Sequence, residues 1–153
     1  MKTSKMKGFT LIELIVVIAI IGVLAAILVP SMIGYVGSSK LATANSNAKL
    51  AFENAATYCT ESEVAGYTTT FDSGTDIDLS GYTAGATYVK DGSHLSDALG
   101  SLMGGHKGAG VARVAISTAG VPEKAIWAKT TADKYVGEYP NERTEKSSGF
   151  AFA

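Results

Sequence analysis

The stretch that decides the fold is "KGFTLIELIVVIAIIGVLAAILVP", residues 7–30. From Phe9 to Val29 the chain is apolar for about 21 residues, roughly 31 Å as an α-helix, which is the thickness of a bilayer's hydrocarbon core. Thr10 and Glu13 interrupt it. Lysines at positions 2, 5 and 7 precede it without any acid. The positive-inside rule therefore predicts a single-pass segment whose N-terminus is cytoplasmic and whose C-terminus lies outside.

Three interpretations of this segment differ in how they explain Glu13. A secretory signal peptide has a shorter apolar core and a small-residue cleavage site, which does not follow here. A plain membrane anchor leaves the carboxylate unexplained, although burying it in a membrane costs on the order of 3 kcal/mol. Cleavage after Gly8, where no Cβ hinders a protease, would instead leave an amino group on Phe9 with a reference pKa of about 7.7–8.0. That cation could pair with Glu13 of the same chain or of a staggered neighbour.

Residues 7–30 resemble the N-terminal signature of type IV pilins and the related pseudopilins: a basic leader ending in Gly, then Phe, a Glu at the fifth mature position and an apolar helix with a Pro near its end. The resemblance implies that a prepilin peptidase cuts between Gly8 and Phe9, and that Phe9 is N-methylated. It also implies that Glu13 pairs with the Phe9 amine of an adjacent subunit during assembly.

Gly22 and Pro30 match the positions that bracket a helical stretch that loosens in assembled type IV pili. Gly is a poor helix former, and Pro30 removes a backbone hydrogen bond at roughly 3 kcal/mol in an ordinary helix interior. Close helix packing in a membrane is an alternative role for Gly22.

We expect three parts: a cleaved basic leader (1–8), a transmembrane and filament-core helix (9–30), and a globular head (31–153). Loss of the leader's three lysines would leave ten basic residues against 14 acids, a formal charge of −4. The fold class implied by the resemblance is α+β and type IV pilin-like, with a long N-terminal helix packed on a small antiparallel sheet.

The apolar spacing predicts that the helix continues to about residue 65, where Gly66 is a C-cap candidate. Its second half is expected to be amphipathic, with Asn45 on the polar face. The stripe expected to cover the sheet comprises Ile33, Val36, Ala44, Ala48, Ala51, Phe52, Ala55, Tyr58 and Cys59.

Strand composition and alternation predict strands at 67–71, 86–90, 111–118, 124–130 and 134–139. Between them, Ser93 is expected to cap a short helix that ends at Gly104 and presents Leu95, Leu99, Leu102 and Met103 on one face. Trp127 and Tyr135 are expected to be packing residues. The tail "SSGFAFA" either docks as a terminal strand or lies loose.

The sequence shows no catalytic constellation and no cofactor motif, so we expect neither enzymatic activity nor a bound metal. His94 and His106 lack partners at metal-ligand spacing. Asp72, Asp76 and Asp78 suggest a calcium loop, but their spacing departs from the known loop motif, which favours a solvated acidic loop. The single Cys59 excludes an intramolecular disulfide and is expected to be buried and inert. A formal charge of −1 gives no reason to expect nucleic acid.

The expected function is that of a structural, major-pilin-like subunit that polymerises into a type IV pilus serving adhesion, twitching motility or DNA uptake. The alternatives are a pseudopilin of a type II secretion or competence system, and an anchored binding protein that never polymerises. The resemblance implies as partners further copies of the chain, a prepilin peptidase, an assembly ATPase and a membrane platform. The precursor would reside in the cytoplasmic membrane and the assembled pilus outside the cell.

Overall fold

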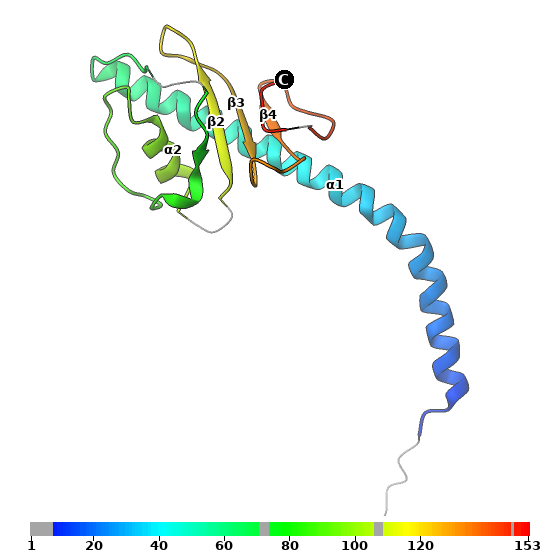
Figure 1. Cartoon of the computed structure of the whole chain (residues 1–153). Helices are drawn as coiled ribbons and strands as arrows, with labels where there is room; N and C mark the ends of the chain where they lie inside the picture. Colours follow the sequence, from blue (N-terminus) through cyan, green and yellow to red (C-terminus); the bar gives the residue numbers. More distant parts are fainter. Residues whose placement is uncertain (1–7, 71–73, 106–108, 148) are drawn as a thin grey trace, which may run out of the picture. The chain divides into compact units, whose positions relative to one another are not determined.

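The structure, a computed structural model, describes residues 8–70, 74–105, 109–147 and 149–153. The chain separates into two compact units, the first ending at Gly37 and the second running from Ser38 to Ala153. The elements are helix α1 (Leu11–Val64), strand β1 (Ile77–Asp78), 3-10 helix η1 (Leu79–Gly81), helix α2 (Leu95–Met103) and strands β2 (Val111–Ile116), β3 (Pro122–Ala128) and β4 (Gly137–Tyr139). Figure 1 shows them in the order of the sequence.

The part of α1 in the first unit is apolar all round and exposes its side chains. Leu11, Ile12 and Ile27 expose 76%, 70% and 70% of their surface, although such side chains are normally buried in a folded protein. Among the described residues, α1 is the one helix long and apolar enough to cross a membrane. This part of the helix therefore needs a surrounding that the single chain does not supply.

The second unit is built on a four-stranded antiparallel sheet in the order β1-β2-β3-β4. Val111 of β2 pairs with Ala128 of β3, and Ile126 of β3 pairs with Glu138 of β4. The register shifts between Ala115 and Ile116, near the β2–β3 hairpin. Strands at 111–118, 124–130 and 134–139 are thus confirmed, each somewhat shifted or shortened.

One face of the sheet packs against both helices of the second unit, with α1 running beside the strands (Figure 1). Small residues on α1 let the backbones approach closely. A Cβ on Gly137 of β4 would overlap the backbone of Ala44 and Asn45. The buried core comprises Ala44, Ala48, Ala51, Ala55, Tyr58, Ile77, Leu79, Leu95, Ala98, Leu99, Ala109, Ala112, Val114, Ala125 and Trp127.

The other face of the sheet is covered by the C-terminal tail. Phe150 is buried with Ile126, Ala128 and Val136, and Phe152 packs at the edge of the same cluster. The described part of the tail therefore docks on the sheet without forming a strand.

A polar network ties α1, β4 and the C-terminal segment together. The Asn45 side chain donates to the Arg143 carbonyl (2.8 Å) and accepts from the backbone N–H of Glu138 (3.1 Å). Arg143 donates to the Glu138 carboxylate through Nε (3.0 Å) and forms an ion pair with it through Nη2 (2.9 Å). The Ala153 N–H also donates to that carboxylate (3.0 Å). The expectation that Asn45 lies on the solvent face is wrong, because its amide satisfies buried backbone groups there.

The sheet-facing stripe of α1 also differs from expectation at its start. Ile33 and Val36 are exposed, and the buried residues run from Leu41 to Ser62. Gly66 does end the helix: its φ is +88°, its N–H donates to the Glu63 carbonyl, and the Tyr67 N–H donates to the Ser62 carbonyl. That pattern is a Schellman motif, in which glycine takes the left-handed position.

Two predicted strands are absent. Residues 67–70 and 86–90 are irregular, and residue 71 lies outside the described residues. The β-branched and aromatic side chains of these segments pack in the core instead: Thr69 is buried, and the Tyr88 ring contacts the Tyr58 ring. Strand β1, only two residues long, was not predicted.

Helix α2 is confirmed, but its cap and its apolar face differ from the prediction. His94 holds the N-cap position without a side-chain cap, so Ser93 is not the cap. Leu95 and Leu99 are buried, whereas Leu102 is 47% exposed. Cys59 is buried as predicted, and Trp127 packs in the core with its indole N–H donating to the Ala109 carbonyl at 2.9 Å.

Candidate functional site: the start of α1

Helix α1 begins with a capping box formed by Thr10 and Glu13. The Glu13 Oε2 accepts from the backbone N–H of Thr10 (2.8 Å) and from its hydroxyl (2.7 Å). In return the Thr10 hydroxyl accepts from the backbone N–H of Glu13 (3.3 Å). The box satisfies donors that a helix start otherwise leaves open, and a carboxylate there also suits the helix dipole.

The capping box was missed in reading the sequence, although "TLIE" at residues 10–13 matches its S/T-x-x-E pattern. It supplies a role for Glu13 within one chain. The carboxylate that looked unexplained in a membrane segment is hydrogen-bonded, and all its described bonds go to Thr10. It is also exposed, so a cation can reach it.

Gly8 and Phe9 lie ahead of the helix. Both are exposed, neither is in regular secondary structure, and Phe9 exposes 80% of its surface. Nothing lies within 4 Å of where a Gly8 Cβ would stand. The backbone around this junction is therefore open to a protease in the single chain, while Lys2, Lys5 and Lys7 lie outside the described residues.

Gly22 and Pro30 both lie inside the continuous helix α1. A Cβ on Gly22 would meet nothing within 4 Å. Near Pro30, the Ser31 hydroxyl donates to the Leu28 carbonyl at 2.8 Å, which gives that carbonyl a side-chain donor. In the single chain the stretch between them is helical.

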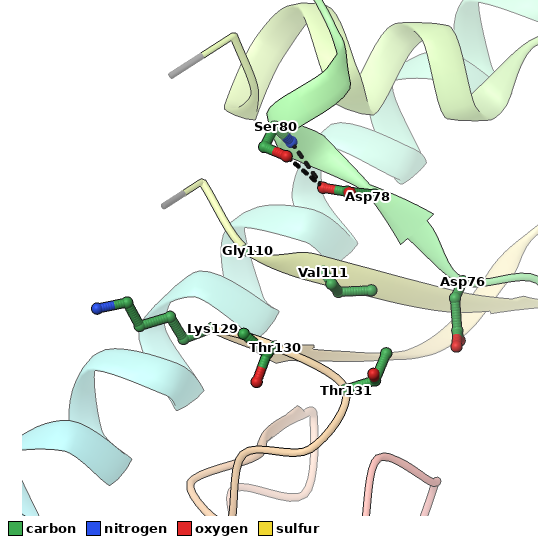
Figure 2. A pocket seen from close by; sticks show the side chains of 8 residues that line it. All are labelled: Asp76, Asp78, Ser80, Gly110, Val111, Lys129, Thr130 and Thr131. Carbon is green, nitrogen blue, oxygen red and sulfur yellow. Dashed lines mark hydrogen bonds between the residues drawn. The ribbon is translucent and has the colours of Figure 1, made fainter. Parts of the chain in front are cut away.

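Asp76 and Asp78, two of the three acidic residues considered for calcium, line an open cavity of about 740 Å³ in the second unit (Figure 2). Asp76 forms an ion pair with Arg113 at 2.6 Å. Asp78 accepts from the N–H (3.0 Å) and hydroxyl (2.7 Å) of Ser80, bonds that lower the pKa of Asp78. Both carboxylates thus already bind groups of the same chain, Arg113 and Ser80. Asp72 lies outside the described residues.

Among the described residues, no group of three His, Cys, Asp or Glu side chains could hold a metal ion. His94 contacts Asp91 at 2.8 Å and Ser93 at 3.1 Å, but both contacts use the same ring nitrogen, Nδ1. A catalytic triad needs the acid and the nucleophile on opposite ring nitrogens, so this cluster is not one. His106 lies outside the described residues.

Comparison with known proteins finds similarity over part of the chain. The family model described as a prokaryotic N-terminal methylation motif matches residues 3–29. The "Type IV major pilin protein PilA" of Myxococcus xanthus (strain DK1622) is 54% identical over 43 residues, 28% of this chain and 20% of that protein. The "Fimbrial protein EcpC" of Eikenella corrodens is 60% identical over 38 residues, 25% of each chain. The "Type IV major fimbrial protein FimA" of Dichelobacter nodosus is 55% identical over 38 residues, 25% of this chain and 24% of that protein.

The fold is α+β and type IV pilin-like, and over residues 3–29 the chain is similar to a prokaryotic N-terminal methylation motif. The chain spans about a fifth to a quarter of the length of the curated relatives it matches, and these are named as pilins and fimbrial proteins. No solved structure matches the chain significantly.

Proposed function

We propose that this chain is a structural, major-pilin-like subunit of a type IV pilus. The observation that carries the proposal is the first part of α1, whose large apolar side chains are exposed within the segment, residues 3–29, that matches a methylation motif. In a membrane, lipid covers those side chains; in a filament, the same surfaces of neighbouring copies would cover them. The relatives named as major pilins favour this function over a secretion or competence pseudopilin.

Assembly would begin with cleavage between Gly8 and Phe9 by a prepilin peptidase. The cut converts the Phe9 amide into an amino group that is mostly cationic near neutral pH, and N-methylation preserves its basic nitrogen. Glu13 of a neighbouring copy would then accept this cation and set the axial register. The opposite charges attract strongly once apolar helices exclude water around them.

The capping box adds a step to this mechanism. Thr10 donates to Glu13 before any partner arrives, so the carboxylate would lie in the membrane with hydrogen bonds in place. A carboxylate has lone pairs for several donors, and so Glu13 can accept the neighbour's amine while keeping Thr10. Gly22 and Pro30 would then mark the stretch of α1 that loosens when copies pack.

A filament follows if each copy contacts the next through two different surfaces, because such contacts do not close on themselves. The leader (1–8) and core helix (9–30) would serve transport and packing, and the head (31–153) would form the outer wall. The proposed partners are further copies, the peptidase, an assembly ATPase and a membrane platform. We propose no catalytic activity, a C-terminus outside the membrane for the precursor, and an extracellular location for the filament.

The test compares Glu13→Ala with Thr10→Ala in cells that express the chain with its assembly machinery. Glu13→Ala removes both the capping box and the charge pair, whereas Thr10→Ala removes the side-chain half of the box and keeps the carboxylate. We expect sheared filaments from wild type and from Thr10→Ala, none from Glu13→Ala, and membrane insertion of all three. Mass spectrometry should find a methylated Phe9 as the first residue.

The outcomes separate the possible roles of Glu13. Equal loss of filaments in both variants would mean that Glu13 acts through the helix cap, and normal filaments from Glu13→Ala would exclude the charge pair. An absence of sheared material from wild type would favour the anchored protein that does not polymerise. A mature start other than Phe9 would contradict the cleavage site.

A further inference from the structure

A groove of about 240 Å³ lies in the second unit between α1 and the loop that follows β3. Lys40 and Thr43 of α1 line it on one side, and Lys129, Asp133 and Tyr135 line it on the other. Trp127 also contributes to its wall. The groove therefore combines two aromatic rings, two cations, a carboxylate and the hydroxyl-bearing side chains of Ser39, Thr43 and Tyr135 within a volume that approaches that of small-ligand sites.

Ammonium groups gather at one ring of this groove. The Nζ atoms of Lys40, Lys134 and Lys146 lie 5.5, 5.7 and 5.7 Å from the centroid of the Tyr135 ring. A ring has two faces, so cation–π attraction does not account for three cations that repel one another. Lys129, the second lysine of the groove lining, is exposed like these three, and none of the four has a described carboxylate within 4.0 Å.

Another lysine on α1 shows what ordinary packing looks like in the same protein. The Nζ of Lys49 lies 5.9 Å from the centroid of the Tyr139 ring and 3.8 Å from the Glu53 carboxylate. Lys49 thus contacts one aromatic ring and one carboxylate. The three lysines near the Tyr135 ring share that ring but have no described carboxylate partner, which leaves a local excess of positive charge in a chain whose formal charge is −1.

The remaining groups of the groove are suited to a ring that carries hydroxyls. Asp133 uses Oδ1 to accept from the Tyr135 N–H (3.0 Å), and no described bond uses its Oδ2. Thr43 donates its hydroxyl to the Ser39 carbonyl (2.9 Å), which leaves the oxygen as an acceptor. The Trp127 N–H is committed to Ala109, so Trp127 offers the groove its apolar ring.

We infer that this groove binds an acidic sugar, that is, a saccharide ring bearing a carboxylate or a phosphate. The lysines would hold the anionic group, Asp133 and Thr43 would accept from ring hydroxyls, and the aromatic rings would contact the apolar face of the sugar. Asp133 would accept from a hydroxyl, and a DNA phosphodiester backbone has none to donate, which favours a hydroxyl-bearing sugar over DNA. The inference stands on the second unit alone and does not depend on polymerisation.

The chain provides its own probe for the test, because Trp127 is its single tryptophan and lies in the groove wall. The full chain in non-ionic detergent is titrated with glucuronate and with glucose 6-phosphate while tryptophan fluorescence is recorded. Glucose and inorganic phosphate serve as the sugar without the charge and the charge without the sugar. We expect a saturable change with both acidic sugars, at a Kd at least about fivefold below those of the two comparison ligands.

Three substitutions locate the site. Lys40→Gln and Lys129→Gln should each raise the Kd about fivefold, because each removes a charge-assisted contact. Lys49→Gln, on the same helix, should leave the Kd unchanged. The lysines are exposed, so all three variants should keep the wild-type circular dichroism spectrum.

Several results would overturn the inference. One is the absence of a saturable fluorescence change with either acidic sugar at millimolar concentrations. Another is an increase in Kd for Lys49→Gln as large as that for Lys40→Gln. Equal affinity for inorganic phosphate and glucose 6-phosphate would indicate a site for oxyanions without recognition of the sugar. Binding of a single-stranded DNA oligonucleotide tighter than that of both sugars, and lost in Lys40→Gln, would indicate a nucleic-acid site.

Discussion

The two parts of α1 use apolar residues in opposite ways. From Leu11 to Val36 the large side chains of Leu, Ile and Val are exposed, whereas from Leu41 to Ser62 four of the six fully buried residues are alanines, the others being Tyr58 and Ser62. This difference in burial arises because the sheet covers the second part of α1, whereas none of the described residues covers the first part. Small side chains bring that sheet close, and large ones present apolar area to lipid or to other copies.

The largest effect should come from Gly137, where β4 meets α1. We expect Gly137→Val to lower the free energy of unfolding of the second unit by about 4 kcal/mol or more, because the new side chain would occupy the space of the Ala44 backbone. Denaturation of the full chain in detergent, followed by Trp127 fluorescence, measures this.

Gly81→Ala is the matched control, because a Cβ at Gly81 would meet nothing within 4 Å and its backbone is not left-handed. It should change the free energy of unfolding by less than about 0.5 kcal/mol. Equal effects of the two substitutions would mean that the close approach of β4 to α1 is not what limits stability.

The next largest effect should come from Glu138, which holds the C-terminal segment to the sheet. Its side chain is 3% exposed and that of Arg143 is 13% exposed, so removal of the acid leaves a mostly buried guanidinium without its carboxylate. We expect Glu138→Ala to cost about 3 kcal/mol, measured by the same denaturation. Glu138→Gln keeps an acceptor for the Ala153 N–H and should cost less, whereas a cost near zero for Glu138→Gln would mean that the charge is unimportant.

The same substitution made in both parts of α1 tests the comparison directly. Ala48 is fully buried against the sheet, and Ala25 is exposed in the apolar part. Ala48→Leu should lower the free energy of unfolding of the second unit by about 2 kcal/mol through overpacking. Ala25→Leu should leave that free energy unchanged and alter the yield of sheared filaments instead, so equal effects on stability would contradict the contrast.

Residues that act through local patterns were predictable from the sequence. The apolar run of residues 9–29, the Gly66 cap, α2 and the strands at β2 and β3 each follow from spacing or composition within one segment. The long α1 and its antiparallel sheet, and hence the fold class, were predicted on the same basis together with the family resemblance.

Residues that act through distant partners were not predictable in this way. Asn45 was assigned to the solvent face because it is polar, but its partners, Glu138 and Arg143, lie more than ninety positions away in sequence. Lys40 and Lys129 line the groove, and the Nζ atoms of Lys40, Lys134 and Lys146 lie near the Tyr135 ring. No local sequence pattern brings these lysines together. The capping box of Thr10 and Glu13, by contrast, is a local pattern that the sequence contains at residues 10–13. It was not predicted because Glu13 was interpreted through the family resemblance alone.

The smallest effect should be a pH dependence carried by His94 at the start of α2. The hydrogen bond to Asp91 raises the pKa of His94 above its ordinary 6.5, with the charges of Asp91 and Asp97 acting in the same direction. The same bond lowers the pKa of Asp91. Tyr58 contacts His94 only through the backbone, where its hydroxyl accepts the His94 N–H at 2.8 Å.

A raised pKa in the folded state means that folding favours the protonated imidazole. The stabilisation is therefore fully present below pH 6.5 and is lost as the pH rises through the folded-state pKa of His94. We expect the urea midpoint of wild type to fall more than that of His94→Gln between about pH 5.5 and about pH 8.5. Because His94 and Asp91 are exposed, the difference between the two proteins should be the smallest of the effects predicted here. Parallel midpoints would show that the Asp91 contact does not distinguish the two protonation states of His94, and a larger fall in His94→Gln would reverse the sign of the linkage.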